Sequence, residues 1–233
     1  MRVCIVQADN RPALDYLQLT KKVNKIMAAH FNYDYQFVQI QDEREDYCDP
    51  FLHPASKKIY VVDDFLQKKS HDIMVFLDSD AWIQNGTYLE EIITKLAENP
   101  DKHGCFSRDP YAVQNTYINS GSFILKVNDY TQKMYKHIIW HLSAYTLFHH
   151  IWPFDQHYVS EFVLDNRDKF YVFVPDVLNT PTGRILRHNW HKTVELELNT
   201  KVITDQSRQE REETERSWVF EFDACIDTKS YPN

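Results

Sequence analysis

Two aspartates separated by one residue follow an apolar run in the segment VFLDSDAWI, residues 75–83. In an extended chain, residues i and i+2 point to the same side, so Asp78 and Asp80 can present both carboxylates together. Neighbouring carboxylates repel each other, and a hard divalent cation relieves that repulsion. The pair therefore predicts a metal site. Aspartate also suits an N-cap or a turn, so the pair alone leaves a structural role open.

The elements that must position these aspartates alternate along the chain. The unbroken apolar run before Asp78 is typical of a strand that is buried on both faces. Strands are predicted at residues 3–7, 35–40, 73–78, 104–107, 122–127 and 170–175, and helices at 54–69, 88–98, 130–147 and 154–163. A further helix is predicted from Pro12, with its apolar residues at helical spacing: Tyr16, Leu19, Val23, Ile26 and Met27.

This alternation predicts βαβ units and an α/β fold with a mostly parallel central sheet flanked by helices. Ligands of such sheets bind at the carboxyl edge, where Asp78 and Asp80 would lie. The chain has 233 residues and no evident linker, so we expect a single domain. Hydrophobic residues make up 43% of the chain, which is enough for a packed core.

Composition excludes several classes of partner. The formal charge is −8, and lysine and arginine are scattered without a basic stripe, so we expect no nucleic acid partner. No apolar run approaches the roughly 20 residues of a membrane span. The apolar stretch of the N-terminus is too short for a signal peptide, and the four cysteines are widely spaced free thiols. We therefore expect a soluble, cytoplasmic protein.

Glycine is scarce, with four residues in the chain. A Gly-rich phosphate loop or a GxGxxG fingerprint is excluded, so any nucleotide must be held by another device. The same scarcity disfavours a sugar-nucleotide pyrophosphorylase, which needs a Gly-rich N-terminal loop.

Several segments, in chain order, resemble glycosyltransferases of the GT-A fold. LDSDA is the form that the DxD motif takes in these enzymes. PASKKIYVVDDFL is similar to the helix before that motif in galactosyl- and mannosyltransferase-like families, and it places Lys57 toward the nucleotide-sugar. INSGSFILK resembles the segment beside the donor sugar, which implies a donor contact for Asn119.

Two later segments continue the resemblance. WPFDQHYV is similar to the segment near the acceptor and assigns Asp155 and Gln156 to it. RHNWHK is similar to the HxxGxxK segment that closes over the diphosphate, which makes His188 a metal ligand and Lys192 a phosphate contact. One position departs from the pattern, because His191 stands where the family has glycine. His191 therefore remains an alternative ligand.

The resemblance covers residues 1 to about 192 and is strongest to the small soluble glycosyltransferase domains of large algal DNA viruses, which glycosylate capsid protein. It implies a single Rossmann-like GT-A domain over residues 1–233, with a nucleotide-sugar-binding part at about 1–127 and an acceptor-binding part at about 128–233. If the chain is viral, its place is the host cytoplasm, and L-rhamnose is the suggested sugar.

The implied reaction moves a sugar from a nucleoside-diphosphate donor, a UDP-sugar by preference, to a hydroxyl of a glycan or glycoprotein. Asp78, Asp80 and His188 would hold Mn²⁺, with Mg²⁺ as the alternative. Gln7, Asp9 and Ser79 would join the donor-binding set, with Gln7 and Asp9 on base and ribose.

The acceptor hydroxyl must lose a proton, and Asp155 is the candidate base, which predicts inversion of configuration. If Asp155 only positions the acceptor, retention is the alternative. Trp152, Phe154 and His157 offer surface for stacking a sugar ring.

Other interpretations stay open. A catalytically weak sugar- or nucleotide-binding module would have the same motifs. A phosphohydrolase of the haloacid-dehalogenase type also uses a DxD, but on the first strand and with Thr or Val where this chain has Trp82. The NSG segment could also be a simple turn, with Gly121 at positive φ.

Overall fold

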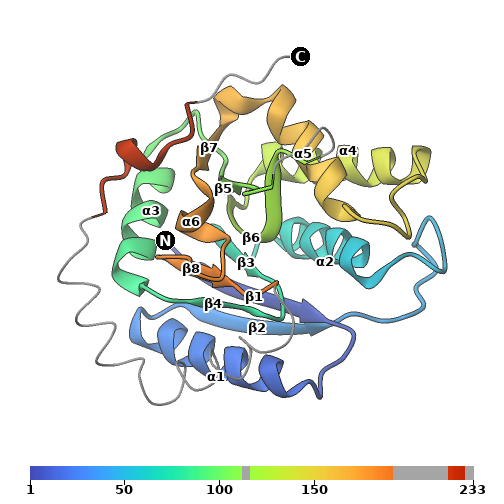
Figure 1. Cartoon of the computed structure of the whole chain (residues 1–233), viewed down its shortest axis with the longest axis horizontal. Helices are drawn as coiled ribbons and strands as arrows, with labels where there is room; N and C mark the ends of the chain where they lie inside the picture. The colour runs from blue at the N-terminus through green and yellow to red at the C-terminus, as the bar shows by residue number, and fades with distance from the viewer. Residues whose placement is uncertain (112–115, 191–219, 229–233) are drawn as a thin grey trace.

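Six strands form one central sheet in the computed structural model, which describes residues 1–111, 116–190 and 220–228 (Figure 1). Their order across the sheet is β2 (Asp34–Gln39), β1 (Val3–Asp9), β3 (Ile73–Leu77), β6 (Ile118–Lys126), β5 (Gly104–Arg108) and β7 (Phe170–Phe173). Strand β6 runs antiparallel to both of its neighbours, and the other pairs are parallel. The predicted α/β fold with a mostly parallel sheet is confirmed.

Helices cover both faces of this sheet. One face packs against α2 (Pro54–Lys68), α4 (Asp129–Ala144) and α5 (Asp155–Asp165), and the other packs against α1 (Asp15–His30) and α3 (Gly86–Glu98). Alternate residues of β3 supply the two cores: Met74 and Phe76 face the first, and Ile73, Val75 and Leu77 face the second. Every residue of β3 is buried, as its unbroken apolar run predicts.

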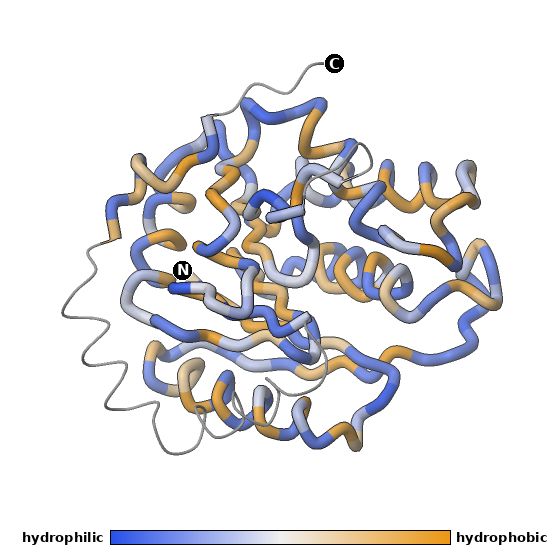
Figure 2. Tube along the Cα trace, viewed as in Figure 1, coloured by the Kyte–Doolittle hydropathy of each residue, from blue (hydrophilic) through white to orange (hydrophobic). Residues whose placement is uncertain are grey.

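Helix α1 shows a stripe that differs from the predicted one. Its buried positions are Leu17, Thr20, Asn24 and Ala28. Ile26, assigned to the apolar face from its spacing, is 59% exposed. Figure 2 shows α1 at the lower edge of the molecule, where hydrophobic and hydrophilic residues mix along its length. The buried stripe contains two polar residues because their side chains bind the backbone of the DxD turn.

Three short elements were not predicted. Strands β4 (Ala81–Ile83) and β8 (Leu186–His188) pair antiparallel to form a small second sheet. Helix α6 (Pro175–Leu178) precedes β8.

All four cysteines are free thiols. Within the ranges above, no helix has the length and apolar character that crossing a membrane requires.

Candidate metal and donor site

The DxD turn joins the central sheet to the small second sheet. Asp78 follows the last residue of β3, and Asp80 precedes the first residue of β4. Strand β8 pairs with β4 so that His188 lies opposite Ala81, and the N–H of Asn189 donates to the carbonyl of Asp80. This pairing brings a histidine from far along the chain beside the two aspartates.

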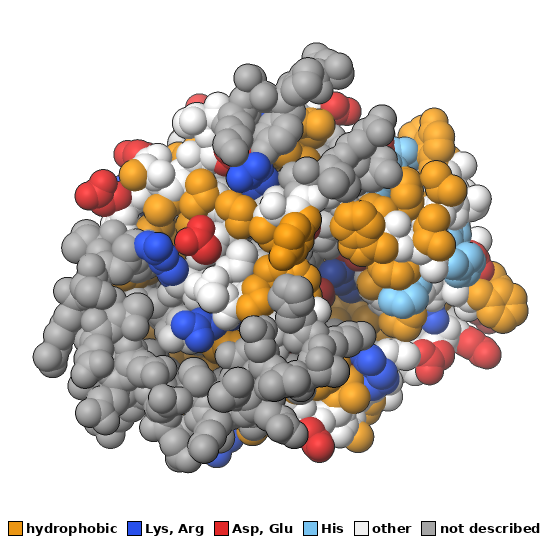
Figure 3. Space-filling view, viewed as in Figure 1, with side chains coloured by type: hydrophobic (Ala, Val, Ile, Leu, Met, Phe, Trp, Pro, Cys, Tyr) orange, Lys and Arg blue, Asp and Glu red, His pale blue; other side chains and the backbone are white. Residues whose placement is uncertain are grey.

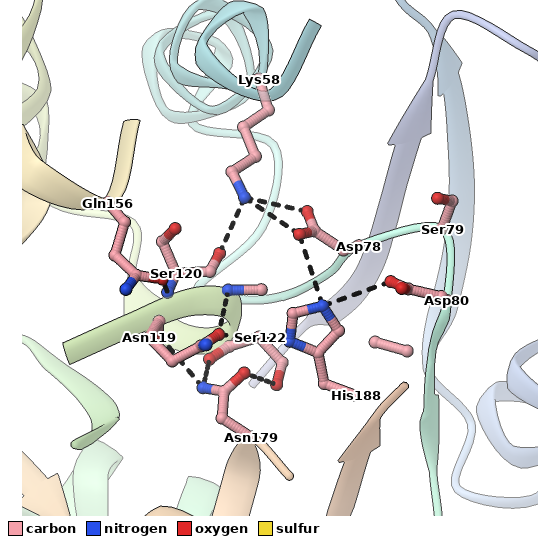
Figure 4. A network of polar contacts seen from close by, with 12 residues as sticks. Lys58, Asp78, Ser79, Asp80, Asn119, Ser120, Ser122, Gln156, Asn179 and His188 are labelled. Carbon is pink, nitrogen blue, oxygen red and sulfur yellow. Dashed lines mark hydrogen bonds and ion pairs between the residues drawn. The ribbon is translucent and has the colours of Figure 1, made fainter. Parts of the chain in front are cut away.

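The side chains of Asp78, Asp80 and His188 converge in this corner (Figure 4). Nε2 of His188 lies 3.2 Å from Oδ1 of Asp80 and 3.7 Å from Oδ2 of Asp78. One ligand atom from each residue lies within 4.8 Å of the others. Two carboxylates and one imidazole are a donor set that suits Mn²⁺ or Mg²⁺, so these residues fit the expected ion.

Asn119 sets the tautomer of His188. Its Oδ1 accepts a hydrogen bond from the N–H of Gly121 (2.9 Å) and lies 3.2 Å from Nδ1 of His188. An amide oxygen only accepts, so Nδ1 carries a proton, and in the neutral ring Nε2 presents its lone pair to the aspartates. Asn119 therefore lies beside the Asp78, Asp80 and His188 cluster, where it orients the ring of His188. Gly121 lies inside β6 and has no positive φ, so its alternative interpretation as a left-handed turn residue is wrong.

The electrostatics of the cluster follow from burial and from opposing charges. Burial raises the pKa of Asp78, and Asp80 adds to the rise, while Lys58 and His188 oppose it. Burial alone would lower the pKa of His188, but the carboxylates of Asp80 and Asp78 raise it overall. The site thus attracts positive charge, which a divalent cation supplies.

Lys58 is the basic residue at these carboxylates. Its Nζ lies 3.0 Å from both oxygens of Asp78 and 3.2 Å from Oδ2 of Asp155, and it donates to the carbonyl of Ser120 (3.1 Å). Burial alone would lower the pKa of Lys58, but the two carboxylates raise it overall. The resemblance assigned the neighbouring Lys57 to the nucleotide-sugar, and the position of Lys58 was not predicted.

Lys57 points elsewhere because consecutive residues of a helix are about 100° apart around its axis. Its Nζ donates to the carbonyl of Asp42 (2.6 Å) and lies 5.2 Å from the ring centre of Tyr47. It lines a separate cavity of about 740 Å³ beside Phe51 and Leu52. The predicted donor contact of Lys57 therefore lies outside the Asp78, Asp80 and His188 cluster.

Asp155 opens α5 and is 3% exposed. Its Oδ2 accepts from Oγ of Ser120 (2.7 Å) and pairs with Lys58. Burial raises the pKa of Asp155 to about 6, with Lys58 opposing the rise and Asp78 adding to it. Gln156 donates to Oδ2 of Asp109 (2.8 Å), which also accepts from Nδ2 of Asn119 (3.3 Å). Asp109, which sequence reasoning did not select, thus links Gln156 to Asn119.

A cleft of about 320 Å³ opens beside the cluster. Its lining includes Asp9, Arg11, Tyr16, His53 and Lys58 in addition to the three cluster residues and Ser79. The carboxylate of Asp9 accepts from the guanidinium of Arg11, with both contacts at 3.1 Å. Of the residues predicted to bind the donor, Asp9 and Ser79 therefore lie at the cleft.

Gln7 lies beneath the turn and does not line the cleft. It is fully buried, and its Nε2 donates to the carbonyls of Asp78 (3.1 Å) and Ala81 (3.3 Å). Its Oε1 accepts from the hydroxyl of Tyr35 (2.8 Å). Both ends of the Gln7 amide are thus hydrogen-bonded within the protein, and these bonds support the DxD turn.

Two residues of α1 complete this support. Thr20 donates to the carbonyl of Ser79 (2.7 Å). Asn24 donates to the carbonyl of Ala81 (3.1 Å) and accepts from the N–H of Ile83 (3.0 Å). The sequence feature that could have indicated this role is the pair Thr20 and Asn24 on the helix face that packs on the sheet, because buried polar side chains need hydrogen-bond partners.

The predicted acceptor residues lie on and beside the loop between α4 and α5. Trp152 is 55% exposed, and the ring of Phe154 stacks on His53 with ring centres 4.0 Å apart. Figure 3 shows hydrophobic side chains gathered with histidines on the side of the molecule where α4 and α5 lie. His191 and Lys192 lie outside the described residues.

No family model and no curated protein sequence matches this chain. Solved structures do. A glycosyltransferase involved in the glycosylation of the major capsid of PBCV-1 is 16% identical, with a TM-score of 0.67, over 86% of this chain and 100% of its own. The glycosyltransferase GlyE of Streptococcus pneumoniae is 8% identical, with a TM-score of 0.58, over 93% of this chain and 64% of its own.

This chain has the fold of these glycosyltransferases. The GT-A fold implied by the sequence segments is thereby confirmed. Mouse xyloside xylosyltransferase 1 is a more distant neighbour, with 12% identity, a TM-score of 0.45, and coverage of 75% of this chain and 85% of its own.

Proposed function

We propose that this protein is a metal-dependent glycosyltransferase that moves a sugar from a nucleoside-diphosphate donor, preferably a UDP-sugar, to a hydroxyl of a glycan or glycoprotein. The main support is the convergence of Asp78, Asp80 and Nε2 of His188 beside a cleft, in a chain with a glycosyltransferase fold. Except for His188, the residues that line this cleft come from the first 80 positions. That distribution supports donor binding by residues 1–127, and we propose that the acceptor binds to residues 128–233.

The chemical difficulty of the reaction is the leaving group, because a departing nucleoside diphosphate gathers negative charge. A divalent cation held by Asp78, Asp80 and His188 would act as a Lewis acid that stabilises this charge. Lys58 holds the carboxylate of Asp78 by two contacts of 3.0 Å, so it orients a ligand and offsets its charge. Asn119 keeps the lone pair of Nε2 directed at the site.

The role of Asp155 decides the stereochemistry. As the acceptor's base, Asp155 would produce inversion. Its burial, its contacts with Lys58 and Ser120, and its position outside the cleft lining favour the alternative left open by the sequence. In that alternative Asp155 only positions the acceptor, and retention of the donor's configuration becomes the expected outcome. The anomeric configuration of the product, read by NMR, distinguishes the two.

Donor hydrolysis with and without Mn²⁺ tests the proposal. UDP-, GDP- and dTDP-sugars are screened, and UDP-L-rhamnose is included because L-rhamnose is the sugar that the sequence resemblance suggests. We expect turnover of one donor class that a chelator abolishes and Mn²⁺ restores. Asp80→Asn should lose this turnover, whereas Asp64→Asn, an exposed aspartate on α2, should keep it. Full turnover in chelator would refute the metal-dependent mechanism.

The same assay separates the enzyme from a binding module. A module would bind UDP–Mn²⁺ in calorimetry but hydrolyse and transfer none of the donors. The ligand assignment is tested in parallel with His188→Ala and His191→Ala. We expect the larger loss of Mn²⁺ affinity in the His188 variant, and the reverse order would assign the ligand role to His191.

A further inference from the structure

A second cluster of ligand-bearing side chains lies away from the DxD turn. Asp49 belongs to the segment between β2 and α2, and His149 and His150 belong to the segment between α4 and α5. Oδ2 of Asp49 lies 3.1 Å from Nδ1 of His149 and 2.9 Å from Nε2 of His150. One ligand atom from each of the three residues lies within 4.8 Å of the others. Among the described residues, this is the one other group with such an arrangement.

The hydrogen bonds of His149 define which nitrogen is available. The ring is 2% exposed, and its Nε2 lies 2.7 Å from the carbonyl oxygen of Leu142. A carbonyl only accepts, so Nε2 carries a proton. In the neutral ring, Nδ1 then directs a lone pair at the carboxylate of Asp49, 3.1 Å away, and a cation bound between the two atoms removes their repulsion.

Asp49 is oriented in the same manner. Its Oδ1 accepts from the N–H of Phe51 (2.8 Å), which leaves Oδ2 for the two histidines. In metal sites, a ligating histidine usually donates its other N–H to a partner such as a backbone carbonyl, and a ligating carboxylate usually accepts a further hydrogen bond. His149 and Asp49 both have such a contact. Cys48 lies 4.0 Å from Nε2 of His149, on the protonated side of the ring, so it is outside this donor set.

We propose that Asp49, His149 and His150 bind a transition-metal cation, with Zn²⁺ as the preferred ion. Two imidazole nitrogens and one carboxylate oxygen form a common zinc donor set. With ligand distances of about 2.1 Å, the corners of a tetrahedron are roughly 3.4 Å apart, close to the distances between Asp49 and the two histidines. His150 is 54% exposed, so water can complete the coordination.

The cation would clamp two segments that meet at the rim of the cleft. The N–H of His53 donates to the carbonyl of His149 (3.1 Å), and His53 stacks on Phe154. His53 lines the cleft, and Phe154 directly precedes α5. Binding at Asp49, His149 and His150 would therefore fix both sides of this rim, where the cleft meets the loop that carries Trp152.

Calorimetric titration of the whole chain with Zn²⁺ tests this second site. The DxD cluster is also proposed to bind a cation, so the diagnostic binding event in this titration is one that Asp80→Asn retains and His150→Ala loses. His150 is the preferred position because its exposed ring can be removed without opening the core. Losing this ligand should reduce the affinity of that event by at least about tenfold. The melting temperature should rise with Zn²⁺ in the wild-type chain and rise less in His150→Ala.

A matched control is available in His71→Ala. His71 pairs with Asp34 through Nε2 and Oδ2 at 2.8 Å, and no third ligand of the described residues completes that pair. This variant should bind Zn²⁺ as the wild type does. Co²⁺ in place of Zn²⁺ should give a ligand-field absorption that His150→Ala loses. The proposal is overturned if Zn²⁺ binding is confined to the DxD cluster, or if His150→Ala binds as tightly as the wild type. Either result would leave the contacts of Asp49 with His149 and His150 as structural contacts without a metal role.

Discussion

The imidazole ring of His188 lies directly against the backbone of Gly121. A Cβ at residue 121 would lie 1.8 Å from Cε1 and 2.1 Å from Nδ1 of His188, far inside contact distance. Gly121→Ala must therefore displace the ring from Asp78 and Asp80. We expect Mn²⁺ affinity, measured by calorimetry, to fall by at least about tenfold.

Gly104→Ala is the matched control for this variant. Its Cβ would lie 2.6 Å from Cδ2 of Leu125 and 2.8 Å from the carbonyl oxygen of Ile124, so the substitution crowds the contact between β5 and β6 instead of the metal cluster. Both variants should lose about 1–3 kcal/mol of unfolding free energy through overpacking, but only Gly121→Ala should lose Mn²⁺ affinity. Unchanged Mn²⁺ binding in Gly121→Ala would show that His188 is not a ligand from its present position.

Lys58→Met is expected to destabilise the fold more than Lys57→Met. Removing Lys58 leaves the carboxylates of Asp78 and Asp155 without their buried cation, which costs about 3–5 kcal/mol. Lys57 makes one charged hydrogen bond to the carbonyl of Asp42, worth about 1.5–3 kcal/mol. Urea unfolding measures both. Lys58→Met combined with Asp155→Asn should lose less than the sum of the single variants, and strict additivity would argue against the bridge.

Gln7→Met distinguishes support of the DxD turn from contact with a nucleotide. Methionine fills similar space but leaves the carbonyl of Asp78 without its side-chain donor and the hydroxyl of Tyr35 without its acceptor, while the carbonyl of Ala81 keeps the hydrogen bond from Asn24. We expect the free energy of unfolding to fall by about 1–3 kcal/mol, with a smaller effect on UDP binding at temperatures where the variant is folded. A stable variant with strongly reduced UDP affinity would instead return Gln7 to the donor-binding set.

Mn²⁺ binding should depend on pH through His188. Burial alone would lower the pKa of this histidine, but Asp80 and Asp78 raise it above the ordinary value of 6.5. Its protonated form stabilises the metal-free fold below that value, and this contribution is lost as pH rises through the raised pKa. A ligating Nε2 must be unprotonated, so Mn²⁺ affinity should rise as pH increases above 6.5, and binding should release a proton.

Calorimetry in two buffers of different ionisation enthalpy measures that proton directly. The His71→Ala variant should show the same proton release as the wild type, because its ring pairs with Asp34 at a distance from the cluster. Mn²⁺ binding without proton release over this range would mean that His188 is neutral before the metal arrives.

The sequence by itself determined the six main strands, their alternation with helices, and the position of Asp78 and Asp80 after a buried strand. These features depend on local periodicity, which survives without knowledge of distant contacts. The order of the motif-like segments also sufficed to indicate the glycosyltransferase fold that the solved structures confirm. The buried face of α1 was misassigned because it contains Thr20 and Asn24. These polar residues are buried because they form hydrogen bonds with the backbone of residues 79–83, which hydrophobicity alone cannot reveal.

Only the tertiary structure decided which side chains meet. The resemblance already assigned His188 to the metal, but its approach to the aspartates through β8 and β4 was not predicted, because strands of three residues have no periodicity that a sequence can display. The choice between Lys57 and Lys58 depends on the rotation of α2 about its axis, which packing sets. Gln7 is buried, and Asp49 meets His149 and His150, because segments far apart in sequence close on one another. Such contacts result from the packing of the whole chain, so no local pattern could specify them.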